Sequence, residues 1–201
     1  MIVVRLGGPA YKIGMGGGYS SSVNQNSDNC NTDYSAVQRG DPEMETKMNN
    51  VIRYLIDNYN PIISIHDQGS GGLANVVKEI VYPYGGEINL ENVTLGDKSM
   101  TPLEIWCSEF QESNVIVIHK NDIELVQNLA LRENICCDLL GIITSSKKIV
   151  VNYKGKVLVD LPLEEILEPP LRKTYDMTEI KYSKKETGLG IPQLLNTMII
   201  T

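Results

Sequence analysis

The stretch that decides the fold reads Ile62-Ile63-Ser64-Ile65-His66-Asp67-Gln68-Gly69-Ser70-Gly71-Gly72-Leu73. Its β-branched residues follow Asn60-Pro61 and predict a buried strand, which three glycines separate from a helix-forming segment. In α/β sheets, ligands bind beyond the carboxyl ends of strands, where glycines let backbone N–H groups approach an anion. Asp67 therefore lies where a magnesium ligand or a substrate contact would be useful.

The glycines of this turn, Gly69, Gly71 and Gly72, leave two interpretations open. A glycine-rich turn after a strand is either a structural connection or an anion site. No Gly-Lys-Ser or Gly-Lys-Thr follows, and the glycine spacing is not G-x-G-x-x-G. The turn is therefore neither a Walker loop nor a dinucleotide-binding fingerprint.

Length and charge limit the kind of protein this is. With 201 residues and 42% hydrophobic content, the chain can bury the core of one large domain. A formal net charge of −7 argues against nucleic acid or an anionic membrane as the main partner. No stretch approaches the roughly 18–20 apolar residues of a membrane span, and the first residues are too short for a secretory signal. We expect a cytoplasmic chain.

Cysteine and histidine offer little material for chemistry. The four cysteines form no CxxC pair, so we expect reduced packing residues rather than metal ligands. The two histidines are His66 and His119. Alternation along a strand places His66 on the opposite side from Asp67. We assign no catalytic residue.

A helix is predicted over residues 43–59, before the central strand. Asp41 is a suitable N-cap and Pro42 a suitable first-turn residue. Apolar side chains recur at steps of three and four, which predicts a core-facing stripe. The stripe consists of Met44, Met48, Val51, Ile52, Leu55 and Ile56.

The remaining pattern alternates strands and helices. Strands are predicted at 2–6, 87–93, 114–119, 138–144, 148–153 and 157–160, with a hairpin turn at 154–156. Helices are predicted at 73–81, at 101–106, and at 121–133 with Asn121 or Asp122 as cap. We expect one domain over residues 1–167 and a linker, or the lead-in to a missing module, over 168–201. A strand at residue 2 suggests a piece of a longer protein.

Two further glycine stretches lie near the N-terminus. One is Gly7-Gly8-Pro9, and the other contains Gly14, Gly16, Gly17 and Gly18. The missing Cβ atoms let backbone approach a ligand or another strand, although a flexible loop is the alternative.

Several stretches occur in an order that resembles one family. They are Gly7-Gly8-Pro9-Ala10, Ile13 to Gly18, Val37 to Glu45, His66 to Leu73, and Pro102 to Glu112. The chain resembles phosphoribosylformylglycinamidine synthase over residues 2–167, in particular its long single-chain form. The motifs in register are more specific than any one of them alone.

This resemblance implies the carboxyl-terminal half of a PurM-like, AIR synthase-related module, an α/β domain with a mixed β-sheet and packed helices. It also implies an ATP-dependent ligase of purine biosynthesis. The family enzyme uses ATP, Mg²⁺ and glutamine-derived ammonia to convert formylglycinamide ribonucleotide to the amidine. The ATP-site half, the second PurM-like module and the glutaminase have no counterpart here, so we expect them as partners and expect the chain alone to be inactive.

Specific residues follow from the resemblance. Asp67 resembles a magnesium ligand, and Gln38, Glu109, Phe110 and Gln111 resemble substrate contacts. Two positions depart from the family pattern, because Phe110 replaces a serine and Ser113 replaces an arginine. The second departure removes a cation that could steady a phosphate or a carboxylate. Phe110 is alternatively a core aromatic, and Glu109 and Gln111 are alternatively a solvated helix end.

Two other functions remain open at this point. The chain could be an interaction or scaffold domain that keeps the fold without the chemistry, which the departures at 110 and 113 favour. It could also resemble another PurM-like enzyme, such as aminoimidazole ribonucleotide synthetase or a selenophosphate or thiamine-phosphate kinase relative. The stretch Pro102 to Cys107 matches the amidating family more closely than these.

Overall fold

A mixed seven-stranded sheet organises the part of the chain that the computed structural model describes, residues 1–15, 40–110 and 112–167. The strand order is β2-β4-β1-β5-β3-β6-β7. Only the pairing of β3 with β6 is parallel among these neighbours. The strands are β1 (Ile2–Gly7), β2 (Ser64–Asp67), β3 (Gly86–Asn89), β4 (Ser113–Ile118), β5 (Cys136–Ile143), β6 (Lys148–Tyr153) and β7 (Lys156–Pro162).

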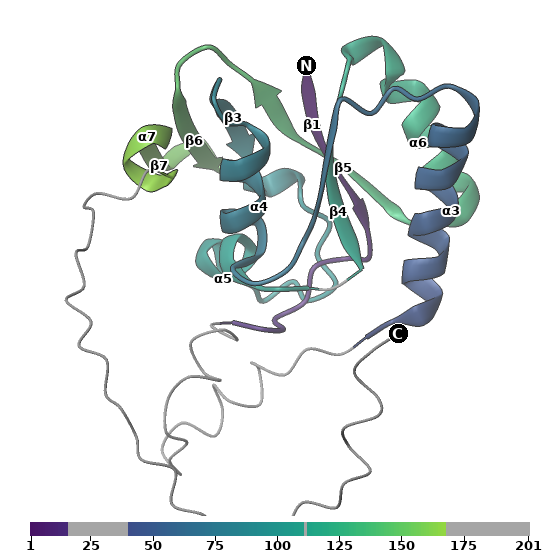
Figure 1. Cartoon of the computed structure of the whole chain (residues 1–201). Helices are drawn as coiled ribbons and strands as arrows, with labels where there is room; N and C mark the ends of the chain where they lie inside the picture. Colours follow the sequence, from purple (N-terminus) through teal and green to yellow (C-terminus); the bar gives the residue numbers. More distant parts are fainter. Residues whose placement is uncertain (16–39, 111, 168–201) are drawn as a thin grey trace, which may run out of the picture. The chain divides into compact units, whose positions relative to one another are not determined.

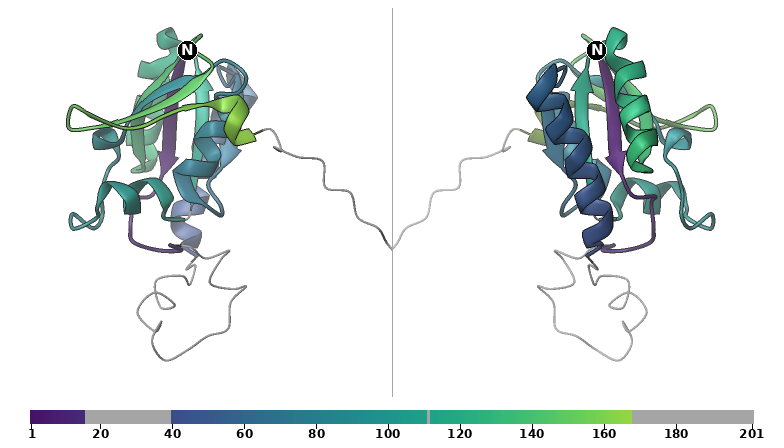
Figure 2. Two further views of the ribbon diagram at one scale, coloured as in Figure 1. Left: turned by 90° about the vertical axis from the view of Figure 1, so that its left-hand side faces the viewer. Right: turned by 90° about the vertical axis from the view of Figure 1, so that its right-hand side faces the viewer.

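Helices cover both faces of this sheet. They are α3 (Pro42–Asn58), α4 (Gly72–Ile80), α5 (Pro102–Cys107), α6 (Ile123–Glu133) and α7 (Leu163–Leu167). Figure 1 shows α3 and α6 on one side and α4 and α5 on the other. The two views of Figure 2 show each helical layer from its own side. The predicted α/β class with a mixed sheet and packed helices is confirmed.

Each face of the sheet has its own hydrophobic core, and β1 contributes to both because its side chains alternate. Val4 and Leu6 pack with the buried residues of α3 and α6. Val3 belongs to the core beneath α4 and α5. All three side chains are fully buried, so β1 is the centre of the domain.

Helix α3 begins as the sequence predicted. The Asp41 carboxylate accepts a hydrogen bond from the Met44 N–H at 3.0 Å, and Pro42 is the first helical residue. The helix buries Met48, Val51, Ile52 and Leu55. Ile56 was expected to face inward, but 52% of it is exposed because it lies outside the stripe that touches the sheet.

The central strand is not buried as predicted. β2 lies at an edge of the sheet and pairs only with β4. Ile63 and Ile65 are 48% and 46% exposed. A run of β-branched residues predicts a strand, but it does not say how many neighbours will cover that strand.

The other predicted elements are present, with one shortened. The strand expected over 87–93 ends at Asn89, and residues 90–92 form a 3-10 turn, η2. Another 3-10 turn, η3 over residues 120–122, leads into α6, whose N-cap Asp122 makes no side-chain capping bond. No helix within the described ranges is long and apolar enough to cross a membrane. The linker predicted over 168–201 lies outside the described residues and stays a prediction.

Candidate functional site

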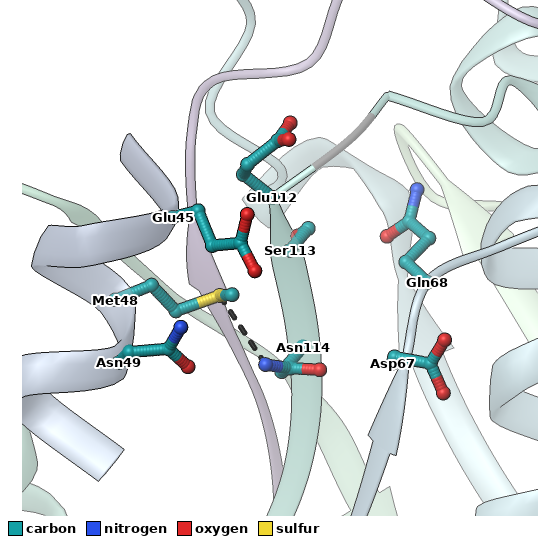
Figure 3. Close-up of a pocket in the computed structure, with 8 residues that line it drawn as sticks. All are labelled: Glu45, Met48, Asn49, Asp67, Gln68, Glu112, Ser113 and Asn114. Carbon is teal, nitrogen blue, oxygen red and sulfur yellow. Dashed lines mark hydrogen bonds between the residues drawn. The ribbon is translucent and has the colours of Figure 1, made fainter. Parts of the chain in front are cut away.

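One end of the sheet holds a polar pocket of about 230 Å³. The pocket lies between the start of α3, the end of β2 and the start of β4 (Figure 3). Its lining consists of Glu45, Met48, Asn49, Asp67, Gln68, Glu112, Ser113 and Asn114. Among the described residues, three carboxylates and three amides line it, and no lysine or arginine does.

The turn from β2 into α4 is shaped by its last two glycines. Gly71 and Gly72 have φ angles of +83° and +59°, which disfavour any side chain. A Cβ on Gly72 would also lie 2.3 Å from the carbonyl oxygen of Ser108. A Cβ added to Gly69 would meet nothing within 4 Å. Close packing of α4 against the backbone at Ser108 therefore requires glycine at 72, whereas the left-handed backbone favours glycine at 71.

Glu109 occupies the position where the turn was expected to meet an anion. Its side chain is buried, and its carboxylate accepts a hydrogen bond of 3.0 Å from the Gly71 N–H at the start of α4. The positive end of the helix favours that charge. At this N–H the anion is the chain's own carboxylate. The alternative of a solvated helix end is wrong for Glu109.

Asp67 stands at the rim of the pocket. Its side chain is 89% exposed, and in Figure 3 its carboxylate points away from Glu45 and Asn114. In the described part of the chain, no three His, Cys, Asp or Glu side chains are arranged to hold a metal ion. The assignment of Asp67 as a magnesium ligand stays a prediction.

His66 does not simply face away from Asp67. Its Nδ1 lies 2.7 Å from the carbonyl oxygen of Asp67 and 3.6 Å from the carboxylate. Its Nε2 lies 2.8 Å from the Glu79 carboxylate of α4. Burial lowers the pKa of His66, but the Asp67 carbonyl and the Glu79 carboxylate outweigh burial and raise it. The imidazole therefore links the end of β2 to α4.

Gln68 is a pocket residue that the sequence did not single out. It is only 6% exposed, and its Nε2 donates to the Ser108 carbonyl at 3.3 Å. Its Oε1 is buried without a hydrogen-bond partner. Figure 3 shows this oxygen on the side of the amide that faces Ser113. The available signal was an amide placed between a strand-end carboxylate and a glycine turn.

Glu112 lies opposite Gln68 and was also missed as a site residue. Its φ of +51° is unusual for a residue with a side chain. Burial raises the pKa of its carboxyl, and the carboxylates of Glu45 and Asp41 raise it further, although the Asp41 N–H hydrogen bond acts against them. Negative charge accumulates here, and the part of the pocket wall that the structure describes carries no lysine or arginine.

Ser113 stands where the family pattern has arginine, and its side chain contacts another arginine, Arg5. The Ser113 hydroxyl accepts a hydrogen bond of 3.0 Å from the guanidinium of Arg5, which is fully buried. Arg5 also donates to Asp138, through Nε at 2.9 Å, and to the Gly8 carbonyl. The Asp138 carboxylate also accepts hydrogen bonds from the N–H and the hydroxyl of Thr94. This cluster is the Arg5–Asp138 network.

A second cavity of about 530 Å³ adjoins the pocket at Glu112. It is lined by Gly8, Pro9, Tyr11, Ile13, Gly40, Asp41, Pro42, Met44, Phe110 and Glu112. Residues from four of the stretches singled out in the sequence thus meet at one place. Phe110 is 1% exposed, and the Arg5 guanidinium lies 5.0 Å from its ring centroid. The structure shows a core aromatic that also forms one wall of the cavity.

Several predicted site residues lie outside the described part of the chain. These are Gln38, Gln111, Gly16, Gly17 and Gly18. Gly7 approaches β4 so closely that a Cβ there would lie 2.0 Å from the carbonyl oxygen of Glu112. Its neighbour Gly8 lines the second cavity.

A family model agrees with this architecture. The model for the AIR synthase related protein, C-terminal domain, matches residues 1–154. The chain belongs to this family. The matched range contains the sheet as far as β6, the pocket and the glycine turn.

Curated relatives of this family member carry one enzyme name. A probable phosphoribosylformylglycinamidine synthase of Arabidopsis thaliana is 41% identical over 94% of this chain and 15% of the relative. The Homo sapiens phosphoribosylformylglycinamidine synthase is 46% identical over 75% of this chain and 12% of the relative. The resemblance inferred from the motifs is confirmed. The chain spans only about a seventh of the length of these relatives.

Solved structures share the fold of this AIR synthase-related domain. Thermotoga maritima PurL complexed with FGAR matches with a TM-score of 0.79 at 20% identity, over 90% of this chain and 30% of that chain. The same protein complexed with ATP matches with a TM-score of 0.73. At this identity the likeness establishes the fold.

The pocket has the chemistry that a magnesium ion requires. Mg²⁺ binds hard oxygen donors, keeps several waters, and takes one or two carboxylates from a protein. The lining supplies carboxylate and amide oxygens, including the unpartnered Oε1 of Gln68. In this domain Asp67 would hold such an ion through its carboxylate and Gln68 would face its bound water, and the ion would supply positive charge to the pocket.

Proposed function

We propose that this chain forms one wall of the site where formylglycinamide ribonucleotide is amidated with ATP, Mg²⁺ and glutamine-derived ammonia. The whole reaction belongs to a longer phosphoribosylformylglycinamidine synthase, a C–N bond-forming ligase of purine biosynthesis. The observation that carries the proposal is the meeting of separate motifs at one end of the sheet. The names of the curated relatives support the same reaction.

The geometry suggests a role for each wall. Phosphoryl transfer depends on positioning and charge neutralisation, so a magnesium-binding wall beside a substrate cavity suits it. In this proposal Asp67 gives Mg²⁺ a direct oxygen. Gln38, Phe110 and Gln111 contact the ribonucleotide, and Phe110 does so from the wall of the second cavity. Glu109 acts on the substrate side mainly by fixing the glycine turn at Gly71.

The partners in this proposal are the remaining modules of the longer polypeptide, which include the ATP-site half, the second PurM-like module and the glutaminase. The relatives support this, because most of their length lies outside the matched segment. We also propose a cytoplasmic enzyme and an isolated chain without amidation activity. Amidation of the ribonucleotide by the purified 201-residue chain with ammonia and ATP would contradict the last point.

The test of the function is Asp67→Asn in a full-length synthase that contains this segment. The substitution keeps the shape and removes the charge, so half-maximal rate should require about tenfold more Mg²⁺, as expected when a metal contact is lost. Asp160→Asn is the matched control, because Asp160 is an exposed carboxylate of β7 at the opposite edge of the sheet. Equal magnesium dependence in both variants would contradict the assignment.

An interaction or scaffold domain is the second candidate, and one apolar groove favours it. The groove, of about 290 Å³, is lined by Leu90, Pro102, Leu103, Trp106, Val151, Leu158 and Val159. Leu103 is 64% exposed, and such patches often mark contact surfaces. Under this alternative, Leu103→Glu would disrupt the longer polypeptide's assembly while Asp67→Asn would leave its rate unchanged.

A further inference from the structure

The pocket contains one buried acceptor that the domain itself does not satisfy. Buried side-chain oxygens almost always find a hydrogen-bond partner, because leaving one unpaired costs about 1–3 kcal/mol. The Oε1 of Gln68 has none, although 94% of the residue is buried. Its Nε2 is fixed on the Ser108 carbonyl, which determines where the oxygen points. A missing donor therefore belongs in the pocket.

The walls around this oxygen define what kind of donor fits. Glu45 and Glu112 reach the pocket from α3 and from the residue before β4. Asn114 uses its Nδ2 on the Met48 sulfur at 3.4 Å, and Figure 3 shows its amide oxygen on the opposite side, toward β2. Among the described residues, the guanidinium that reaches the pocket residue Ser113 is that of Arg5, and it is already paired inside the Arg5–Asp138 network. The pocket offers oxygen acceptors to a donor with positive charge.

The size and spacing of the pocket favour an ion that keeps its water. Three acidic side chains close enough to bind a bare ion are absent from the described residues. A water molecule occupies about 30 Å³ in the liquid, so the five waters that an octahedral ion keeps beside one protein oxygen need about 150 Å³. The pocket measures about 230 Å³. Mg²⁺ gives up its waters reluctantly and is commonly bound through them.

We propose that Mg²⁺ bound at this pocket by a direct oxygen of Asp67 keeps the rest of its water shell, and that Gln68 Oε1 accepts a hydrogen bond from one of those waters, with Glu45 and Glu112 balancing the charge. Gln68 is then a positioning residue for the metal rather than a direct ligand. The inference rests on the proposed function, in which Mg²⁺ binds at this end of the sheet beside Asp67. It adds residues that the resemblance to the synthase did not supply.

Direct titration of the 201-residue chain with Mg²⁺ by isothermal titration calorimetry at constant ionic strength tests this inference. Gln68→Met keeps the size of the side chain and removes the acceptor, so the dissociation constant should rise by about tenfold, as for other residues that act through a metal's outer shell. Gln68→Glu keeps an acceptor at the same place and adds negative charge. It should bind Mg²⁺ at least as tightly as the natural chain.

The control separates metal binding from folding. Gln127→Met makes the same substitution on an exposed position of α6 and should change neither affinity nor stability. Urea unfolding of each variant reports stability independently of the metal. Both Gln68→Met and Gln68→Glu lose the Nε2 donor to Ser108. If Gln68 acts only through that donor, Gln68→Glu would bind Mg²⁺ no better than Gln68→Met. That pattern would overturn the inference.

Asp67→Asn in the same titration distinguishes this inference from the proposed function. Weaker binding in both Asp67→Asn and Gln68→Met supports both. Weaker binding in Asp67→Asn alone overturns the role of Gln68 and leaves the proposed function standing. Unchanged binding in both variants overturns both assignments. Absence of saturable Mg²⁺ binding by the natural chain would overturn a specific magnesium pocket. An equal heat of binding when NaCl is titrated in place of MgCl₂ at the same ionic strength would overturn it as well.

Discussion

Two polar clusters lie on either side of Ser113, and they differ in how completely they are paired. In the Arg5–Asp138 network, all three guanidinium nitrogens donate hydrogen bonds, and both carboxylate oxygens accept them. In the pocket, the Oε1 of Gln68 is unpartnered, and the described lining pairs three carboxylates with no lysine or arginine. Complete pairing is what a structural cluster requires, whereas missing partners indicate a place for a ligand.

The difference also explains the departure at position 113. A serine where the family pattern has arginine was expected to remove a cation. The structure supplies one from β1, where Arg5 reaches the Ser113 hydroxyl and lies over the ring of Phe110. Because this guanidinium is buried and each of its three nitrogens already donates a hydrogen bond, it stabilises the junction of β1, β4 and β5 and does not neutralise the pocket.

The largest predicted effect is on the paired cluster. Asp138→Ala leaves the Arg5 guanidinium buried without its carboxylate, and removing one partner of a buried ion pair typically costs about 3–5 kcal/mol. The free energy of unfolding from urea titration should fall by that amount. Replacing both partners, as Arg5→Met with Asp138→Leu, should cost less than the sum of the single changes. Additive losses would show that the two residues are not a structural pair.

The sequence predicted most of the fold because its patterns are local. The cap at Asp41 and the β-branched runs mark helix and strand from neighbouring residues alone. Burial of β2 was predicted wrongly because it depends on the order of strands in the sheet. The same limit applies to Glu109, whose carboxylate is paired with Gly71 across 38 residues.

The candidate site was only partly accessible from the sequence. Asp67 and the glycine turn are visible because a carboxylate and glycines at a strand end form a recognisable pattern. Gln68 and Glu112 could not be assigned, because an unpartnered oxygen and a left-handed backbone are properties of the folded chain. The roles of Gln38 and Gln111 stay predictions, since both lie outside the described residues.

The next effect concerns the turn that holds Gln68 in place. Gly72→Ala adds a Cβ at a left-handed φ and directly against the Ser108 carbonyl, which is the acceptor for Gln68 Nε2. We expect a loss of at least about 1–3 kcal/mol in the free energy of unfolding. Gly69→Ala is the matched control within the same turn, because nothing lies within 4 Å of its added Cβ. Equal losses would mean that the contact with Ser108 is not what selects glycine.

A smaller effect is expected on the pKa of Glu112, which reports the unbalanced negative charge of the pocket. Glu45→Gln removes a carboxylate that raises the pKa of Glu112, so that pKa should fall toward its ordinary value, while burial still holds it above. A carbon-detected NMR titration of the Glu112 side chain follows this directly. Glu43 lies in the same first turn of α3 but pairs with Lys47. Glu43→Gln should therefore leave the pKa of Glu112 unchanged. An equal shift of the Glu112 pKa in both variants would indicate the electrostatic field of the whole domain rather than a local effect within the pocket.

The smallest effect concerns the imidazole that joins the end of β2 to α4. Because the folded-state pKa of His66 is raised, its contribution to stability is fully present below the unfolded value of about 6.5 and is lost as pH rises through the higher folded value. The free energy of unfolding should therefore decline slightly with rising pH above about 6.5. His66→Gln should flatten that part of the profile, whereas His119→Gln should leave it in place. Since His66 is 30% exposed, solvent screens its pairing with Glu79, and the change should be well below the losses at Asp138 and Gly72. A free energy of unfolding that rises with pH in this range would contradict the pairing of His66 with Glu79 and the link between β2 and α4.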